Sequence, residues 1–359
     1  MTKVSVLYPA TDTLAASYTL YPLLHKDSVK RVDFFLDPAA LQTDRNRHLL
    51  MVGWLRGSKS PSAEEINWLE RLRNKYSVIA YLDCNDGAEI QRAAFMRYFD
   101  LWFVKQAFRD RRDYMIDYEG QRFYTPFYID RYGVSDGNQA QSWSTVVPKA
   151  DIGKIRVCWN ILIGAYPLRP VNAKCSAYML NAGFPRLAGR VVRPPIFRKQ
   201  PSPALPKCHA RFDHRVYRPT VGYQRVLFQD AVRNSPEFLV GPVPRRQYNR
   251  ELRTVQAVLS PFGWGEVCFR DAEAVLAGAV LIKPAMDHVD TWPNIYEPNE
   301  TYVPVMWDAS NVVPKTQSIL RDASERQRLC ANAWHTLQAA YRQIPERVEQ
   351  VLDTVLAGK

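Results

Sequence analysis

The segment from Val258 to Pro284 decides the fold of this chain, and it reads V-L-S-P-F-G-W-G-E-V-C-F-R-D-A-E-A-V-L-A-G-A-V-L-I-K-P. A short apolar run ends in a Ser-Pro turn, and a glycine-rich loop follows it. The next residues have the composition of a helix with carboxylates in its first turns, and Gly278 leads into a buried strand, Ala279 to Ile282. The segment therefore predicts a strand, loop, helix and strand unit with a polar loop at its mouth.

This loop has the features of a ligand site, because the corresponding loop of a βαβ unit lies at the carboxyl end of the sheet, where open α/β folds bind ligands. Gly263 and Gly265 would let the backbone approach a ligand closely, and the start of the helix would offer N–H groups to an anion such as a pyrophosphate. Trp264 is a candidate to stack on a sugar or a nucleobase. Glu266, Arg270 and Glu273 share one face if Glu266 is already helical, and could hold sugar hydroxyls, ribose hydroxyls and phosphate oxygens.

The segment resembles the donor-binding motif of retaining GT-B glycosyltransferases of the "glycosyl transferases group 1" type, and the matching region of exostosin-like transferases. In the group 1 motif a glycine-rich loop precedes two glutamates separated by seven residues, and the second glutamate opens an E-A-x-x-x-G segment before an apolar strand. Residues 273–278 read E-A-V-L-A-G, so the resemblance implies that Glu273 binds the nucleotide ribose. Only six residues separate Glu266 from Glu273, so Glu266 stays a candidate catalytic residue outside the motif's register, and the choice between retention and inversion is open.

The resemblance extends with lower specificity over about residues 205–312. It implies an α/β fold with two Rossmann-like domains facing a cleft (GT-B), the nucleotide-sugar mainly on the second domain and the acceptor mainly on the first. It also implies a carboxyl-terminal helix that crosses back to the first domain. A Gly-rich loop alone would be weak evidence, since any doubly wound protein can own one.

The alternation of strands and helices agrees with this fold class. A proline-rich stretch, from about Asn160 to Pro206, interrupts it and predicts an interdomain connection. We expect a first domain over residues 1–200, a second over 201–320, and helices over 321–359 that pack back on the first domain or serve as core or dimer contacts. The predicted strands are 4–8, 32–36, 48–54, 78–82, 101–104, 156–159, 208–212 and 238–240, and the predicted helices begin near Ser60 and cover 221–232 and 247–255. Ser324 and Gln327 predict a capping box at the start of the first tail helix.

Charged residues of two kinds are candidates to take part in glycosyl transfer: cations that stabilise the leaving group and a carboxylate that acts as a base. A departing nucleoside diphosphate needs cations, and the candidates are Arg211, Arg225, Arg270 and Lys283, although each could equally be a surface cation. Asp83 ends a predicted strand of the first domain and could be the general base that deprotonates an acceptor hydroxyl if the enzyme inverts. The alternative is that Asp83 and Asp86 cap a following helix.

Composition favours a two-domain protein without a metal or cofactor. The 359 residues are 47% hydrophobic, no stretch of eighteen apolar residues occurs, and the start of the chain is typical of the first strand of a cytoplasmic protein. The six cysteines form no C-x-x-C pair, and Asp83-Cys84-Asn85-Asp86 lacks the D-x-D spacing of metal-dependent GT-A transferases. We therefore expect no metal and no cofactor.

The net charge of +12 calls for an explanation. Basic residues concentrate in 186–199 and 245–253, and could form a solvated face, bind the pyrophosphate or an anionic acceptor, or contact the anionic inner face of a membrane. No nucleic-acid-binding signature is present, and no nucleic acid is expected as a partner. The sequence thus favours a metal-independent glycosyltransferase that uses a nucleotide-sugar donor and a glycan or small-molecule acceptor. The alternatives are a non-catalytic nucleotide-sugar or polyanion-binding protein, and a GT-B-fold epimerase or phosphorylase.

Overall fold

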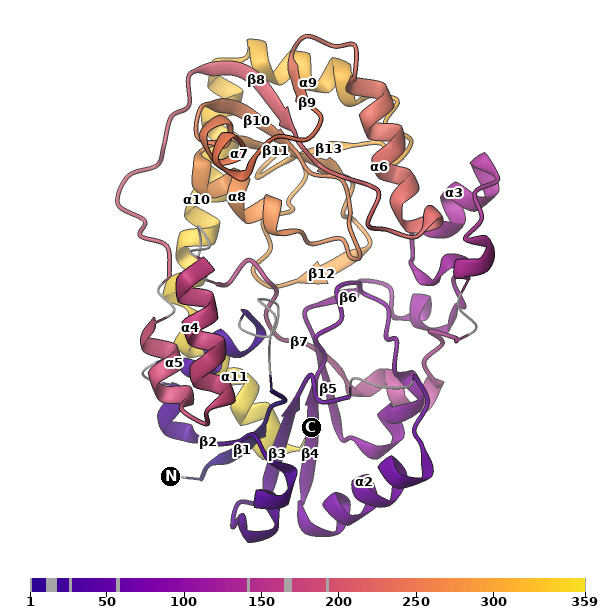
Figure 1. Ribbon diagram of the computed structural model, residues 1–359, viewed down its shortest axis with the longest axis vertical. Helices are drawn as coiled ribbons and strands as arrows, with labels where there is room; N and C mark the ends of the chain where they lie inside the picture. Colours follow the sequence, from indigo (N-terminus) through magenta and orange to yellow (C-terminus); the bar gives the residue numbers. More distant parts are fainter. Residues whose placement is uncertain are drawn as a thin grey trace.

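The computed structural model describes residues 2–10, 18–25, 28–55, 59–140, 143–164, 170–191 and 194–358. Two parallel β-sheets, each flanked by helices, form two α/β domains that lie one above the other in Figure 1. The predicted fold class, two Rossmann-like domains facing a cleft, is confirmed. Buried apolar side chains continue from one domain to the other, as in the contact between Tyr124 and Phe262, whose ring centroids are 5.3 Å apart.

The first sheet contains six parallel strands in the order β2-β1-β3-β4-β5-β7. Their bounds are β1 (Val4–Leu7), β2 (Val32–Phe35), β3 (His48–Val52), β4 (Val78–Leu82), β5 (Leu101–Val104) and β7 (Ile155–Val157). β1, β4 and β5 are buried along their whole length, as expected of strands covered on both faces. Helix α2 (Ala63–Lys75) begins with a capping box between Ser62 and Glu65, and it buries Leu69 and Leu72, whereas Ile66 is only half-buried.

The second sheet contains five parallel strands in the order β13-β11-β10-β8-β9. Their bounds are β8 (Leu205–Ala210), β9 (Phe238–Val240), β10 (Val255–Leu259), β11 (Val280–Pro284) and β13 (Val303–Val305), and the helices are α6 (Pro219–Val232), α7 (Arg245–Leu252), α8 (Phe269–Ala277) and α9 (Val312–Arg321). In both sheets the first strand of the domain lies between the second and the third. The chain reverses direction across the sheet at that point, and ligands of such folds bind at the carboxyl ends of the strands there.

A small antiparallel sheet joins the two domains. β6 (Gln106–Phe108) from the first domain pairs with β12 (Val289–Thr291) from the second, and both lie between the large sheets in Figure 1. Thr291 Oγ1 donates to the Lys105 carbonyl oxygen at 2.8 Å, and Asn160 Nδ2 donates to Thr291 Oγ1 at 2.9 Å. The contact therefore combines main-chain pairing with buried side-chain hydrogen bonds.

Two carboxyl-terminal helices run along the molecule. α10 (Ala323–Arg342) packs on α8, α9 and β11, and α11 (Ile344–Ala357) packs on β1, β3 and β4 of the first sheet. The predicted capping box at Ser324 is wrong. Asp322 is the N-cap of α10, and its carboxylate accepts from the Glu325 amide at 2.9 Å, because the helix begins two residues earlier than the sequence pattern indicated.

The connection after residue 160 contains two helices, α4 (Pro170–Asn181) and α5 (Pro185–Val191). They were not predicted, because the segment is rich in proline and glycine. Large apolar side chains of both helices, such as Tyr178 and Leu187, are exposed, so the helices lack the apolar stripe that predicts a helix. The remaining helix is α3 (Thr125–Tyr132), and the short 3-10 helices are 21–24, 28–31, 38–43, 93–98, 111–115, 119–121, 137–139 and 149–154. Within the described residues no helix is both long and apolar enough to cross a membrane.

Candidate functional site

A cavity of about 470 Å³ lies where loops of the two domains meet. The loops after β1, β3 and β4 of the first domain supply most of its wall, and Arg218 and Trp264 of the second domain complete it. Because these loops follow the carboxyl ends of parallel strands, the cavity occupies the edge at which such sheets bind ligands. The cavity is therefore the candidate binding site for an acceptor.

The glycine-rich loop after β10 closes onto the first domain. A Cβ built on Gly265 would lie 1.7 Å from the Asp86 carbonyl oxygen, so only glycine fits there without a shift of the backbone. The sequence predicted a close approach of this glycine to a ligand, whereas its close approach in the structure is to the other domain. Gly263 accepts a hydrogen bond at its carbonyl from the Tyr124 hydroxyl at 2.6 Å, which adds a second tie between the domains.

Trp264, between the two glycines, lies in the cavity wall as an indole that is 36% exposed. Its ring centroid is 5.3 Å from that of Tyr217, which supports it from the second domain. Trp143 of the first domain also lines the cavity. The cavity therefore presents two indoles, the side chains on which sugar rings and nucleobases commonly stack.

Glu266 is fully buried and is not part of the cavity wall. It accepts a hydrogen bond from the Gln106 side chain of the first domain, and its Oε1 is 3.5 Å from His288 Nε2. A second buried acid, Glu89, lies close to it and pairs with Arg122 at 3.0 Å. Burial raises the pKa of Glu89 above its ordinary value even though Arg122 opposes the shift. Glu266 thus belongs to a polar cluster that the two domains bury between them.

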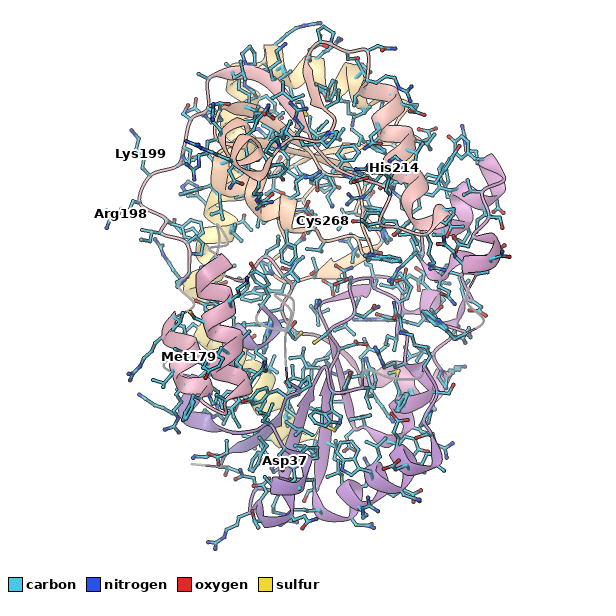
Figure 2. All side chains as sticks on the ribbon, viewed as in Figure 1. Asp37, Met179, Arg198, Lys199, His214 and Cys268 are labelled. Carbon is cyan, nitrogen blue, oxygen red and sulfur yellow. The ribbon has the colours of Figure 1, made fainter. Side chains whose placement is uncertain are left out.

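Helix α8 begins at Phe269, so Glu266 lies outside it and only Arg270 and Glu273 share a helix face. Glu273 accepts from the Tyr248 hydroxyl at 2.6 Å and from Arg245 at 3.2 Å, and its side chain is 15% exposed. Figure 2 shows Cys268, the residue before α8, on the side of the second domain that faces the first.

The start of α8 already holds an anion. The Asp271 carboxylate accepts from the Cys268 amide at 2.9 Å, and it also accepts from the Ser260 hydroxyl at 2.5 Å and the Tyr296 hydroxyl at 2.8 Å. Lys283 lies 3.1 Å from the same carboxylate, and both side chains are fully buried. A carboxylate of the protein therefore lies at the start of α8, and Lys283 neutralises it.

The other predicted cations are also bound to protein groups. Arg211 makes a bidentate pair with Glu251 at 2.9 and 3.0 Å. Arg225 donates to the carbonyl oxygens of Phe262 and Asp213 at 2.6 and 3.0 Å, and so supports the glycine-rich loop. Arg270 donates to the Arg211 carbonyl at 2.7 Å, but its Nε is buried with no hydrogen-bond partner among the described residues.

Asp83 lies in the cavity wall directly after β4. Its Oδ1 accepts from the Asn85 amide at 2.9 Å and its Oδ2 from the Trp102 indole at 3.3 Å. The interpretation of Asp83 and Asp86 as helix caps is wrong, because residues 83–92 form turns and the next helical residues begin at Ala93. Each oxygen of Asp83 retains a lone pair that could accept a proton from a bound hydroxyl.

Four cations of the cavity wall were not predicted from the sequence: Arg122 and Arg218, which pair with Glu89 and Asp136, and Lys59 and Arg92. Lys59 donates to the Gln91 side chain at 2.7 Å and lies 4.9 Å above the Trp143 ring, and neither Lys59 nor Arg92 pairs with a carboxylate of the described chain. Burial lowers the pKa of Lys59 to about 8, and the neighbouring charge of Arg92 adds to the shift. Arg92 Nε is buried with no partner in the described residues. No motif marks these residues, because they come from different loops.

No protein-family model and no curated protein sequence matches this chain. Solved structures of low similarity include a glycosyltransferase from Rickettsia africae ESF-5, with 9% identity and a TM-score of 0.48 over 99% of each chain. They also include HepE of Anabaena in complex with UDP-glucose, with 10% identity and a TM-score of 0.47 over 98% of this chain and 99% of that one. MnaA of S. aureus with UDP aligns at 9% identity and a TM-score of 0.40 over 100% and 98%.

Proposed function

We propose that this protein is a GT-B glycosyltransferase that moves a sugar from a nucleotide-activated donor to a hydroxyl of an acceptor. The observation that carries the proposal is the cavity between the domains, where the Asp83 carboxylate lies in a wall that also contains Trp264 of the glycine-rich loop. Transfer of a sugar between the domains requires two parts. The first domain supplies a carboxylate at its edge, and the second supplies an aromatic side chain in the donor loop.

The donor would bind along α8 and the loop that precedes it. Glu273 is the candidate for the ribose hydroxyls, since its carboxylate accepts two hydrogen bonds and has room for more. Arg270, one turn earlier, is the candidate for a phosphate oxygen, and in the structure its guanidinium donates to the Arg211 carbonyl. Trp264 would stack on the sugar, whereas Gly265 and Glu266 would hold the loop against the first domain.

The acceptor would bind in the cavity itself, with Asp83 as the base in an inverting reaction. Lys59 and Arg92 lie in the same wall without carboxylate partners, and two neighbouring cations in a half-buried site favour an anionic ligand. We therefore propose an acceptor that carries a carboxylate or phosphate group. This arrangement would leave the acceptor hydroxyl near Asp83 and its acidic group near the two cations.

The proposed reaction is independent of a metal ion. Among the described residues there is no group of three or more His, Cys, Asp and Glu side chains placed to hold a metal. The charge that grows on the departing diphosphate would instead be stabilised by arginine and by amide groups of the loop. Activity that survives an excess of EDTA would support this part of the proposal, and activity that returns only with a divalent cation would contradict it.

A specific observation favours a second candidate, a nucleotide-sugar-binding protein without catalysis. Glu266 is buried, and Arg211 and Lys283 are paired with Glu251 and Asp271, so few charged groups of the second domain are free to stabilise a leaving group. Such a protein would bind donor without consuming it.

Release of free nucleotide from a panel of UDP-, GDP-, CDP-, ADP- and dTDP-sugars distinguishes these functions. A transferase releases nucleotide only when an acceptor mixture is added, and Asp83→Asn slows that release. A binding protein shows no release in either condition. An epimerase or hydrolase alters the donor without any acceptor, which would contradict the transferase proposal.

A further inference from the structure

The positive charge of this protein is concentrated in one part of the chain. Residues 152–212 contain eleven Lys and Arg residues and no Asp or Glu, so this segment accounts for nearly all of the net charge of +12. The segment includes α4 and α5, which the proposed transfer reaction does not use. A cationic segment of this length, with no acid within it, indicates a partner of opposite charge or another role for the positive charge.

Five cations of this segment lie on the surface among the described residues. Lys174, Arg186 and Arg190 on the two helices are exposed, and so are Arg198 and Lys199 in the extended stretch that follows. None of these five makes an ion pair with a described carboxylate, whereas the exposed Arg328 pairs with Glu300 at 2.6 Å. Figure 2 shows Arg198 and Lys199 projecting outward at the edge of the molecule, beyond α4 and its Met179.

Large apolar side chains are exposed between these cations. Tyr178 is 76% exposed, Phe184 56%, Leu187 45% and Ile196 74%. They make up four of the eleven exposed large hydrophobic side chains of the described chain, although they span only nineteen positions. Exposed apolar side chains that alternate along the sequence with cations are typical of a segment that lies in the interface of an anionic bilayer, with its apolar side chains below the headgroups.

The helices also lie beside the proposed acceptor cavity. α5 packs against the short helix Tyr21–Leu24, and a Cβ on Gly189 would lie 2.5 Å from the Leu24 carbonyl oxygen. The Tyr8 hydroxyl donates to the Leu180 carbonyl at the end of α4 at 2.9 Å. Pro9 and Leu20, next to these contacts, line the cavity. A bilayer bound to α4 and α5 would therefore lie near the part of the cavity wall formed by Pro9 and Leu20.

We propose that α4, α5 and residues 194–199 form a docking surface for anionic phospholipid membranes. Nucleic acid is the other polyanion that such a charge could bind, but it is bound through stacking on aromatic rings, whereas Leu187 and Ile196 have no π face. Aliphatic and aromatic side chains together fit an acyl-chain boundary. This surface is separate from the donor site, so it can be tested whether or not glycosyl transfer is shown.

Sedimentation with lipid vesicles tests the proposal. The protein should bind vesicles that contain phosphatidylglycerol and not vesicles of phosphatidylcholine alone, and added salt should weaken the binding. Lys174→Gln/Arg186→Gln/Arg190→Gln should lower the affinity about a hundredfold, since each cation near an anionic surface contributes about 1 kcal/mol. The matched control Arg71→Gln/Lys149→Gln/Arg342→Gln removes three exposed cations from other surfaces and should bind as the wild type does.

A natural thiol gives a second, independent measurement. Cys175 on α4 is exposed, whereas burial raises the pKa of the Cys84 and Cys268 thiols and makes them slower to react. An environment-sensitive fluorophore on Cys175 should shift to the blue with anionic vesicles, and Phe184→Ser/Ile196→Ser should reduce the shift. Equal binding of the charge variant and its control would overturn the proposal. So would an unshifted fluorophore, or binding of an oligonucleotide in place of vesicles.

Discussion

Gly265 of the second domain lies against Asp86 of the first so closely that a Cβ on Gly265 would stand 1.7 Å from the Asp86 carbonyl oxygen. The same loop is tied to the first domain through Gly263 and Tyr124, and Glu266 is buried beside Gln106. The glycine-rich loop thus serves as a contact between domains, with Trp264 as its one side chain in the cavity wall. These contacts fix the positions of the two domains relative to each other at the proposed site of sugar transfer.

Gly265→Ala should therefore disturb the domain contact. Because the added methyl group would meet backbone atoms, we expect a loss of stability of about 1–3 kcal/mol, as for other overpacked sites. Gly263→Ala is the matched control, since its Cβ would meet only the ends of the Tyr217 and Arg225 side chains, at 3.1 and 3.2 Å. Urea unfolding of both variants measures the difference, and equal stability of the two would show that the contact is not tight.

Asp83→Asn tests the proposed base. The amide keeps the size of the carboxylate but cannot take a proton, so kcat should fall on the order of 10²–10⁴-fold while donor binding is unchanged. Asp86→Asn serves as the control, because Asp86 lines the same cavity with a carboxylate that is half exposed and 3.4 Å from Lys105. If both variants retain the wild-type rate, Asp83 is not the base.

Lys59 predicts a pH dependence for the binding of acidic ligands. Burial and the neighbouring Arg92 lower the pKa of Lys59 to about 8, so the folded protein loses this charge as the pH rises through 8. Affinity for glucuronate should accordingly fall above pH 8 in the wild type. Lys59→Arg should bind glucuronate evenly up to pH 10, because a guanidinium stays charged. Saturation-transfer NMR measures the binding, and a flat profile in the wild type would count against an anionic acceptor.

The lowered pKa of Lys59 also makes the free energy of unfolding depend on pH. Between pH 8 and the ordinary lysine pKa of 10.5, the unfolded chain binds the proton that folded Lys59 has released. The free energy of unfolding should therefore rise with pH over this window through Lys59, and the rise should be smaller in Lys59→Gln. Urea unfolding at pH 7.5 and pH 10 provides the comparison, and equal pH slopes for the two proteins would contradict the shift.

Breaking the buried ion pair of Lys283 and Asp271 should lower the free energy of unfolding. Lys283→Ala leaves the Asp271 carboxylate buried without its cation, and removal of one partner from such a pair typically costs about 3–5 kcal/mol. Arg215→Ala breaks the exposed pair of Arg215 with Asp213 and should cost no more than about 1 kcal/mol. Chemical denaturation compares the two variants, and similar losses would mean that Lys283 is not a structural cation.

The sequence predicted most of the fold because buried parallel strands are continuous apolar runs, and the ranges of β4, β5 and β9 agree with the predictions to the residue. It failed at α4 and α5, which expose large apolar side chains such as Tyr178 and Leu187, and at the start of α10, where Asp322 caps the helix in place of Ser324. Helices without a buried stripe give no periodic signal.

The site was predicted less completely, because the partners of charged residues are set by the tertiary structure. The sequence places Arg211 at the end of a strand but does not show that Glu251 lies 2.9 Å from it. Lys59 and Arg92 meet only after two loops fold beside each other. The placement of Asp83 and Trp264 at one cavity could be predicted, since both follow the carboxyl ends of strands.

The central claim is that the second domain binds a nucleotide through Glu273, and thermal unfolding with UDP, GDP, CDP, ADP, dTDP and CMP, with and without EDTA, tests it most directly. A ligand at a hundred times its Kd adds roughly 2.7 kcal/mol of stability, which raises Tm by several degrees. We predict that one nucleotide class stabilises the wild type and the control Glu70→Ala, with or without EDTA, but not Glu273→Ala. No shift with any nucleotide, or an equal shift in Glu273→Ala, would contradict the account.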